Sequence, residues 1–480
     1  MKRIIILLLV IAAMISTVAC TQGNDNEKPG MTTTTPGTTE IEEPTYDNAS
    51  FRIGMSGGSN CEFFILEDST DPIDSALYRR NTTVQDKYGV VIRPVYTEAV
   101  GLHGHVDEII EDIMTDNDLY DLTSTMAVAS GALLMSGVVL DWNSLPYTDL
   151  SQSYWISSIN DNFEIDGHIY NAVGDTNMTA LKYTYCMFFN TTAAEDTQVG
   201  LVREVLDKVE NKQWTIDYFN SIVAEVYGDY DDVNGVSGGD FYGFQAENMT
   251  NLDTFTFAFD IPLIKQTDDE NLLELAYSVE RTSIAVDKIL QLYWKNKGTQ
   301  IHTVDAFAHM HYFINGRALF ATSWLDYCFT GLTNMEDDYI VLPYPMLDEE
   351  QDGYYTGMMD NYCVLSVPMI VPDLEMSSVI TEALNREAEK QMYPVYYEES
   401  LGKKYLNDPE IIAILDTIME GRRADFGTLF QKQLSGISMG FRYCVNAKEN
   451  RFAEYYDALS TDMADNLRDI VTQYRANADN

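Results

Sequence analysis

Two pairs of histidines, each separated by one residue, have a spacing that could bind a metal ion: His103 with His105, and His309 with His311. On a strand, such a pair would place both imidazoles on one face, where they could act as zinc ligands. The sequence signals no third ligand for either pair, and the chain has only 6 His in 480 residues. We therefore expect no resident metal, with a zinc-capturing receptor as an alternative.

The stretch DYDDVNGVSGGDFYGF, residues 229–244, has side chains similar to those of calcium-binding loops. Asp232, Asn234 and Asp240 are the candidate ligands, but Val236 and Ser237 provide no carboxylate where one would be needed. The stretch does not match the calcium-loop pattern D-x-[DN]-x-[DN]-G. It favours an acidic surface turn.

Two signatures of catalysis are missing from the sequence. It has no HExxH and no Cys–His context that looks activated. Its 75 Asp and Glu could supply a glycosidase-like pair of carboxylates, but the required separation is spatial. We therefore expect a protein that is not an enzyme and has no cofactor, with a cell-surface carbohydrate-active enzyme as the alternative.

The balance of charges excludes one class of partner. With 30 basic and 75 acidic residues the net charge is −45, which repels phosphate backbones, so we expect no nucleic-acid binding. It also argues against electrostatic attachment to anionic lipids. The hydrophobic fraction of 45% and the aromatic fraction of 12% are those of a globular protein.

The N-terminal residues have the build of a secretory signal peptide. Lys2 and Arg3 precede an apolar run from Ile4 to Ile15, which is too short to span a membrane, and small residues then lead to Cys20. The sequence before Cys20 resembles a bacterial lipobox, although Thr17 stands where Leu is usual. We expect residues 1–19 to be removed and Cys20 to be lipidated; the alternative is cleavage near Ala19 with Cys20 as a chance thiol.

The elements that must position a functional site begin near residue 50. Residues 20–49, with TTTTPGTTE, predict a flexible linker. Phe51–Met55, Val90–Tyr96 and LYDLTSTM predict strands, separated by helices through LYRRNTTVQDKYG and Val106–Met114. This order predicts an α/β fold with parallel pairing. Further along, the sequence predicts a strand at Tyr183–Phe189 and a helix capped by Thr215.

Seven pieces of the sequence occur in an order typical of one family: VQDKYGVVI, LYDLTSTM, GVVLDWNSL, FFNTT, KQWTIDYF, FINGRALFATSWL and IVLPYPML. Over roughly Phe51 to Thr472 the chain resembles bacterial extracellular solute-binding proteins of family 1, lipoproteins that deliver sugars to ABC importers. The resemblance implies a two-lobe fold of the periplasmic-binding-protein type II, with an interlobe cleft and crossing hinge strands. It places residues 50–175 plus 321–372 in lobe one, and residues 176–320 plus 373–480 in lobe two.

The same resemblance implies function and partners. We expect a receptor on the extracellular face of the membrane that binds a sugar or oligosaccharide, contacts the permease subunits of an ABC transporter and is held by a lipid anchor. A sensory lipoprotein of the same fold, and a peptide or other polar solute as ligand, remain alternatives.

Two loops at the carboxyl ends of predicted strands are candidate ligand loops, because ligands of open α/β sheets bind there. One contains Ser56, Gly57, Gly58 and Ser59, which could equally form a plain tight turn, and the other contains Ser124 and Thr125. The first loop matches neither GxGxxG nor GxxxxGK, so it does not predict a phosphate site.

Aromatic and amide side chains complete the candidate site. Trp324 could stack on the apolar face of a sugar, or it could seal the hinge as a core residue. Asp326 would point the same way as Trp324 if that stretch is extended. The weaker candidates, each of which could instead be core or solvated, are Trp155, Tyr183, Tyr185, Asp360 and Asn361.

Five cysteines follow Cys20: Cys61, Cys186, Cys328, Cys363 and Cys444. None belongs to a CxxC pair, and the odd number leaves at least one thiol unpaired. We expect most of them to be buried, small apolar residues.

Overall fold

The computed structural model describes residues 44–56, 62–63, 69–99, 101, 103–230, 239–267, 272–303, 307–396, 408–434 and 436–478, and residues 44–480 form one compact unit. The predicted signal peptide and Cys20 lie outside the described residues, as do the candidate ligand residues Gly57, Gly58 and Ser59. In the part of the chain that the structure describes, no helix is both long enough and apolar enough to cross a membrane.

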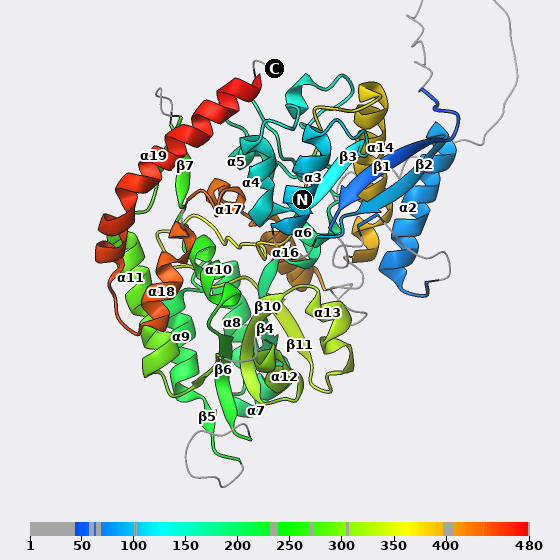
Figure 1. The fold of residues 1–480 in the computed structure, drawn as a ribbon. Coiled ribbons are helices and arrows are strands. Elements are labelled where there is room, and N and C mark those ends of the chain that lie inside the picture. The colour runs from blue at the N-terminus through cyan, green and yellow to red at the C-terminus, as the bar shows by residue number, and fades with distance from the viewer. Residues whose placement is uncertain are drawn as a thin grey trace, which may run out of the picture. The chain divides into compact units, whose positions relative to one another are not determined.

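A four-stranded sheet, in the order β12-β3-β1-β2, forms the first lobe (Figure 1). β1 (Ala49–Met55) is parallel to both β2 (Val90–Tyr96) and β3 (Leu122–Met126), whereas β12 (Cys363–Ser366) is antiparallel to β3. Two helices connect the parallel strands, because parallel neighbours need a crossover: α2 (Pro72–Tyr88) and α3 (Gly104–Met114). The predicted alternation of strands and helices is confirmed.

Helix α2 shows why the chain is helical between β1 and β2. The Asp71 carboxylate caps its first turn by accepting the backbone N–H groups of Ile73 and Asp74, at 2.8 and 3.0 Å. Pro72 occupies the first turn, where a missing N–H costs nothing, and Gly89 ends the helix with φ of 61°. Arg80 lies on the buried face of α2.

The second lobe contains a six-stranded sheet. Its order is β11-β4-β10-β6-β5, with β9 paired to β6. β10 is parallel to β6 and β6 to β9, whereas β4 is antiparallel to both β10 and β11. The strands are β4 (Tyr185–Asn190), β5 (Tyr227–Gly228), β6 (Phe241–Glu247), β9 (Thr299–His302), β10 (Ala318–Trp324) and β11 (Tyr339–Leu342).

Aromatic side chains fill the core beneath this sheet. The rings of Phe189 on β4 and Phe320 on β10 stack with centroids 4.5 Å apart, and Trp214 and Phe219 pack against Phe320. Phe219 belongs to α9 (Ile216–Glu225), which is capped by Thr215 as predicted: its hydroxyl accepts the N–H of Tyr218. The buried rings therefore fix α9 against the centre of the sheet.

In each sheet, one strand that pairs antiparallel to its neighbours is reached by the chain from the other lobe: β4 in the second sheet and β12 in the first. The segment 171–184 leads to β4, and the segment 356–362 leads to β12. These crossing segments run side by side: Ala172 and Leu365 exchange backbone hydrogen bonds of 2.9 and 2.8 Å, and the Met359 N–H donates to the Tyr183 carbonyl. A third segment crosses at residues 421–423, where Thr356 binds Gly421 and Arg423 through the backbone.

Strand pairing differs from the expected division of the lobes. Residues 321–372 were expected in the first lobe, but β10 and β11 pair with β4 in the second sheet. Residues 373–480 were expected in the second lobe, and the structure differs here too. α14 (Leu374–Gln391) packs on α2 of the first lobe. α19 (Phe452–Ala478) contacts both α4 (Ala127–Met135) and α11 (Val279–Leu290). Figure 1 shows α19 running from α11 towards α4 and α5 (Ser157–Phe163). The local sequence pattern predicts that a segment is a buried strand, but it does not predict which strand it pairs with.

The remaining elements are mostly short. A two-stranded hairpin, β7 (Ile264–Gln266) with β8 (Leu273–Leu275), lies after α10. The other helices are α5 (Ser157–Phe163), α6 (Met178–Lys182), α7 (Thr191–Thr197), α8 (Leu201–Glu210), α10 (Thr250–Ala258), α12 (Ala308–Ile314), α13 (Tyr327–Thr330), α16 (Pro409–Glu420), α17 (Phe426–Leu429) and α18 (Gly440–Asn446).

Candidate functional site

A pocket of about 80 Å³ lies beside the crossing segments. Residues from α10 to Leu263, the crossing residues Met358 to Asp360, and α17 form its walls. The polar and aromatic lining comprises three carboxylates (Asp253, Asp360, Asp425), three rings (Tyr185, Phe257, Tyr277) and six uncharged polar side chains (Thr250, Thr254, Thr256, Thr428, Gln431, Ser438). Rings beside hydrogen-bonding groups suit a ligand with apolar faces and polar rims.

Tyr185 is the first residue of β4 and lines the pocket. The residue is buried, with 1% of its surface exposed. Its hydroxyl lies beside Thr250 but makes no hydrogen bond of normal geometry to any described residue. Burial raises the pKa of Tyr185 well above its usual value, so the hydroxyl is protonated and can both donate and accept. The structure therefore brings the predicted residue Tyr185 to the pocket with hydrogen-bonding capacity unused.

Trp324 ends β10 at the centre of a cluster of rings. Its ring centroid lies 6.1 Å from Tyr183, 6.0 Å from Tyr185, 5.9 Å from Phe307 and 5.6 Å from Tyr327. Trp324 stays partly exposed, and Phe307 is 46% exposed. Tyr185 belongs both to this aromatic cluster and to the lining of the pocket, so Trp324 contacts the pocket wall through Tyr185.

Asp360 and Asn361 lie on the second crossing segment, as neighbours of the N-terminus of α4. The Asp360 carbonyl accepts the N–H of Val128 at 3.1 Å, and its side chain lines the pocket. Burial raises the pKa of the Asp360 carboxyl. The Asn361 side-chain oxygen is buried and has no hydrogen-bond partner among the described residues.

Ser124 and Thr125 lie within β3, paired to β12, and not in a loop after the strand as expected, whereas Ser56 directly follows β1. The Ser124 hydroxyl donates to the Glu62 carboxylate at 2.9 Å, so it is already engaged. The hydroxyls of Ser56 and Thr125 are buried and have no partner within the described residues. Among the predicted ligand residues, Ser56 and Thr125 therefore have hydroxyls with unused hydrogen-bonding capacity.

Glu62 is the centre of a buried polar network at the first crossing segment. Its carboxylate accepts the backbone N–H of Thr179 at 3.0 Å, the Thr179 hydroxyl, and the side-chain amide of Asn177 at 3.4 Å. Burial raises the pKa of Glu62, whereas these hydrogen bonds and the charge of Arg80 act in the opposite direction. The network ties the residues after β1 to α6.

Two sequence predictions do not fit the observed geometry. Trp155 is 1% exposed, donates its indole N–H to Glu382 at 3.1 Å and packs edge-on against Trp142, so neither face is left for a ligand. Asp326 was expected to share a strand face with Trp324, but β10 ends at Trp324 and Asp326 is helical, with φ of −58°. Its carboxylate lies 3.8 Å from the Lys182 ammonium instead.

The histidine pairs lie on or beside helices, not on strands. His105 belongs to α3 and His309 to α12, where residues two apart point in different directions. The His309 ring contacts the Thr322 carbonyl at 2.8 Å. Within the described ranges, no group of three or more His, Cys, Asp or Glu could hold a metal ion. The calcium-like stretch lies largely outside those ranges, since residues 231–238 are not described.

Four of the cysteines are described: Cys186, Cys328, Cys363 and Cys444. All four are buried, so the prediction of buried apolar cysteines is confirmed for them.

Asp253 and Asp425 are pocket residues that the sequence analysis missed. Asp253 forms an ion pair with Arg442 of α18, with Nε 2.8 Å from Oδ1. Asp425 caps α17 by accepting the N–H of Gly427 at 2.7 Å, and it also accepts the N–H of Leu263 at 2.6 Å. Asp253 lies in the first turn of α10, which follows β6 closely, and the ends of strands are places where sites occur. No local pattern distinguishes Asp425, which the fold brings from far along the chain.

Asp425 provides a prediction about stability and pH. Burial raises the pKa of its carboxyl to about 6, so between about pH 4 and 6 the folded chain keeps a proton that the unfolded chain loses. Since the folded state then binds more protons, stability falls as pH rises. The free energy of unfolding of the wild type, minus that of Asp425→Asn, should decrease by on the order of 3 kcal/mol across this window. Urea titrations at pH 4.0 and 6.5 measure it; a constant difference would contradict the assignment.

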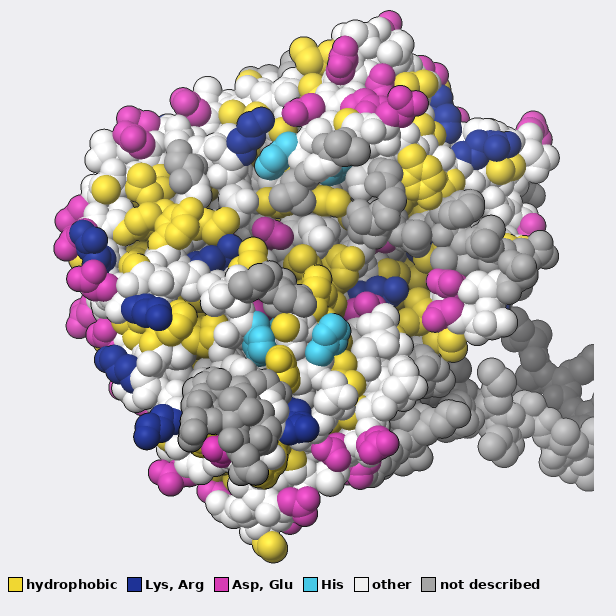
Figure 2. Space-filling view, turned by 60° about the horizontal axis from the view of Figure 1, so that its bottom comes forward, with side chains coloured by type: hydrophobic (Ala, Val, Ile, Leu, Met, Phe, Trp, Pro, Cys, Tyr) yellow, Lys and Arg dark blue, Asp and Glu magenta, His cyan; other side chains and the backbone are white. Residues whose placement is uncertain are grey.

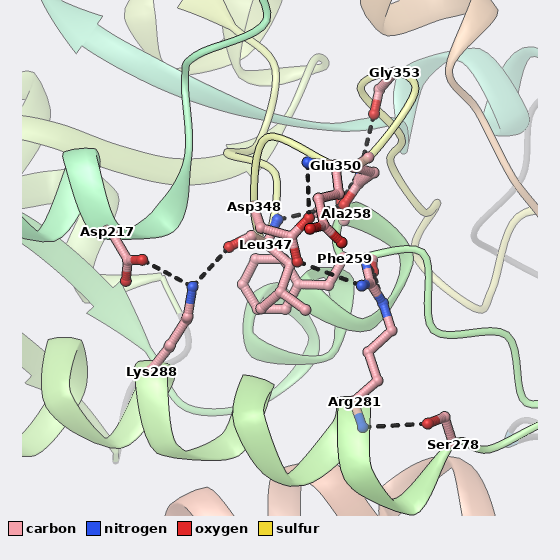
Figure 3. A network of polar contacts seen from close by, with 11 residues as sticks. Asp217, Ala258, Phe259, Ser278, Arg281, Lys288, Leu347, Asp348, Glu350 and Gly353 are labelled. Carbon is pink, nitrogen blue, oxygen red and sulfur yellow. Dashed lines mark hydrogen bonds and ion pairs between the residues drawn. The ribbon is translucent and has the colours of Figure 1, made fainter.

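The loop before the second crossing segment is held by a polar network (Figure 3). Lys288 donates to the Leu347 carbonyl at 2.9 Å and pairs with Asp217 at 2.8 Å, while Arg281 donates to the Phe259 carbonyl. Gln351 is buried; its amide donates to the carbonyls of Ala258 and Gly353, both at 2.8 Å, and accepts from Leu347. The network fixes the chain that leads to Met358 and Asp360.

Gln351→Ala should therefore lower the free energy of unfolding by about 2 kcal/mol, because it leaves buried backbone groups without partners. The matched control is Glu350→Ala, one residue away, whose side chain is exposed. Urea unfolding of both variants measures the difference. Equal losses in the two variants would show that the Gln351 amide does not stabilise the loop.

The described residues thus form two α/β lobes, joined by crossing segments, with a pocket beside them. This is the fold of extracellular solute-binding proteins, and several solved structures share it. The cyclic α-maltosyl-1,6-maltose binding protein from Arthrobacter globiformis matches with a TM-score of 0.59 and 12% identity, over 88% of this chain and 99% of that one. The predicted fold class is confirmed.

Two other structures illustrate the range of this fold. The galacto-N-biose-/lacto-N-biose I-binding protein of the ABC transporter from Bifidobacterium longum matches with a TM-score of 0.58 and 11% identity, over 88% of this chain and 98% of that one. UgpB from Mycobacterium tuberculosis, solved with glycerophosphocholine, matches with a TM-score of 0.52 and 14% identity, over 90% and 98%. No family model and no curated protein matches the sequence.

Proposed function

We propose that this chain is a solute-binding receptor, which captures a sugar or oligosaccharide between its lobes and delivers it unaltered to the permease of an ABC transporter. The observation that carries the proposal is the pocket at the crossing segments. Its rings and carboxylates, together with the unused Tyr185 hydroxyl, match the mixed apolar and polar surface of a sugar. The sugar-binding proteins of the same fold support the choice of ligand.

Ligand entry requires the lobes to move apart. The pocket of about 80 Å³ is smaller than typical ligand sites, which enclose roughly 300–1,000 Å³. Hinge motion at the three crossing segments would widen it, and closure would bury the ligand. Because ligand favours the closed lobes, a permease could distinguish the loaded receptor from the empty one.

The proposal places the receptor outside the cell, held by a lipid on Cys20. The apolar run, the small residues before Cys20 and the polar stretch after it support this anchor. Mass spectrometry of the N-terminal peptide tests it: a diacylated Cys20 is expected, whereas an unmodified peptide beginning near Thr21 or Cys20 would contradict the anchor.

A thermal-shift screen tests the function. The purified chain is mixed with monosaccharides, oligosaccharides, amino acids and peptides, and a ligand at 100 times its dissociation constant should stabilise the fold by ~2.7 kcal/mol. Chromatography of the recovered ligand tests whether it is altered. Stabilisation by amino acids or peptides alone would contradict the carbohydrate, and cleavage of the sugar would contradict the receptor in favour of an enzyme.

A further inference from the structure

The charged residues that line the pocket beside the crossing segments are all acidic. Its lining contains three carboxylates and no Lys, Arg or His. An anionic ligand would therefore find no cation in the described lining to compensate its charge.

The three carboxylates are not equivalent. Asp253 is paired with Arg442, and the Asp425 carboxylate accepts backbone N–H groups of Leu263 and Gly427, so both carboxylates already have partners in the protein. The Asp360 carboxylate has no ion pair or hydrogen bond to another residue within the described ranges. Asp360 is thus the pocket carboxylate whose lone pairs remain for a ligand.

From this difference, which rests on the proposed function, we infer that the cleft selects carbohydrates without negative charge, and that Asp360 is the residue that determines this specificity. Hydroxyl or ammonium groups of a neutral or amino sugar would donate to Asp360. These charge-assisted hydrogen bonds are roughly twice as strong as neutral ones. A second polar group in the same pocket, the unpartnered and buried Tyr185 hydroxyl, points to a ligand there independently of charge.

Acidic sugars, such as uronates, sulfated sugars and sugar phosphates, are repelled both by Asp360 inside the pocket and by the net negative charge of the whole protein. Inside the pocket, a second anion near Asp360 would place like charges together in a poorly solvated site, which disfavours the charged form of one of them. Outside it, the net charge of −45 repels anions before they arrive. In Figure 2, Asp and Glu side chains lie mainly around the margin of the face shown, while hydrophobic side chains gather nearer its middle.

A glycan array tests the inference with ligands of known charge. The labelled, purified chain is applied to neutral glycans, glycans with a free amine, and glycans that carry uronate, sialate, sulfate or phosphate groups. We expect binding to neutral or amino glycans, at least tenfold stronger than to their acidic counterparts. Preferred binding to an acidic glycan would overturn the inference and leave the receptor function standing, whereas no binding to any glycan would contradict both.

Three substitutions identify the residue responsible, measured by calorimetry with the best neutral array ligand and its uronate. Asp360→Asn keeps the shape and removes the charge, and should weaken the neutral ligand at least tenfold. Asp253→Asn frees the Arg442 charge beside the pocket, and should shift the neutral-to-uronate affinity ratio at least tenfold towards the uronate. Asp457→Asn, at an exposed site on α19, is the control. Unchanged affinity in Asp360→Asn would remove Asp360 from this role.

Discussion

Trp324→Ala is expected to weaken ligand binding about 100-fold, the size of effect seen when a central aromatic anchor is truncated. The ring stands at the end of β10, is partly exposed and contacts four other rings, one of which, Tyr185, lines the pocket. Removing it would take away an apolar platform for the sugar and also release Tyr185, which lines the pocket. Calorimetric titration with the ligand found by thermal shift measures the loss.

Destabilisation alone could mimic this loss, so a second tryptophan serves as control. Trp294 is also partly buried, but it belongs to a different contact set: its indole N–H donates to the Val445 carbonyl at 2.7 Å, and Lys448 lies 3.8 Å from its ring centroid. Trp294→Ala should lower the melting temperature while leaving affinity within about twofold, because it touches nothing in the pocket. If Trp324→Ala binds as tightly as Trp294→Ala, Trp324 is a core residue of the hinge.

Local elements could be predicted from the sequence where the pattern is complete within one segment. The strand predicted over Val90–Tyr96 has the same bounds as β2, and the cap predicted at Thr215 forms. Parallel pairing followed from the length of the connections, and the pairings of β1 with β2 and β3 confirm it. In each case the information lies in residues close together in the chain.

Long-range pairing could not be predicted in this way. The residues of β10 mark a buried strand, but nothing in them specifies β4 as the neighbour, so the expected lobe boundary at residue 321 separates strands that pair. The same difference between local and long-range information applies to the residues of the candidate site. Tyr185 and Asp360 lie at strand and crossing positions that could be named, whereas Asp425 reaches the pocket from a four-residue helix far along the chain. Its role depends on backbone groups of the second lobe.

Arg80→Met should lower the free energy of unfolding by about 3–5 kcal/mol, the cost of leaving a buried charge without its partner. The Arg80 guanidinium is fully buried on α2, donates to the Glu62 carbonyl at 2.8 Å and to the Thr176 hydroxyl at 2.7 Å, and lies 5.2 Å from the Phe63 ring. It therefore connects the residues after β1 to the first crossing segment. Arg79→Met, at the exposed neighbouring position, should change stability by no more than about 0.5 kcal/mol.

A double-mutant cycle separates lost packing from unbalanced charge at this position. Arg80 stabilises the ionised Glu62 carboxylate through space, so part of the penalty in Arg80→Met comes from Glu62 itself. Adding Glu62→Gln removes that charge, and the double variant should regain at least about 1 kcal/mol relative to the sum of the single changes. Additive losses would mean that Arg80 acts by packing and neutral hydrogen bonds alone.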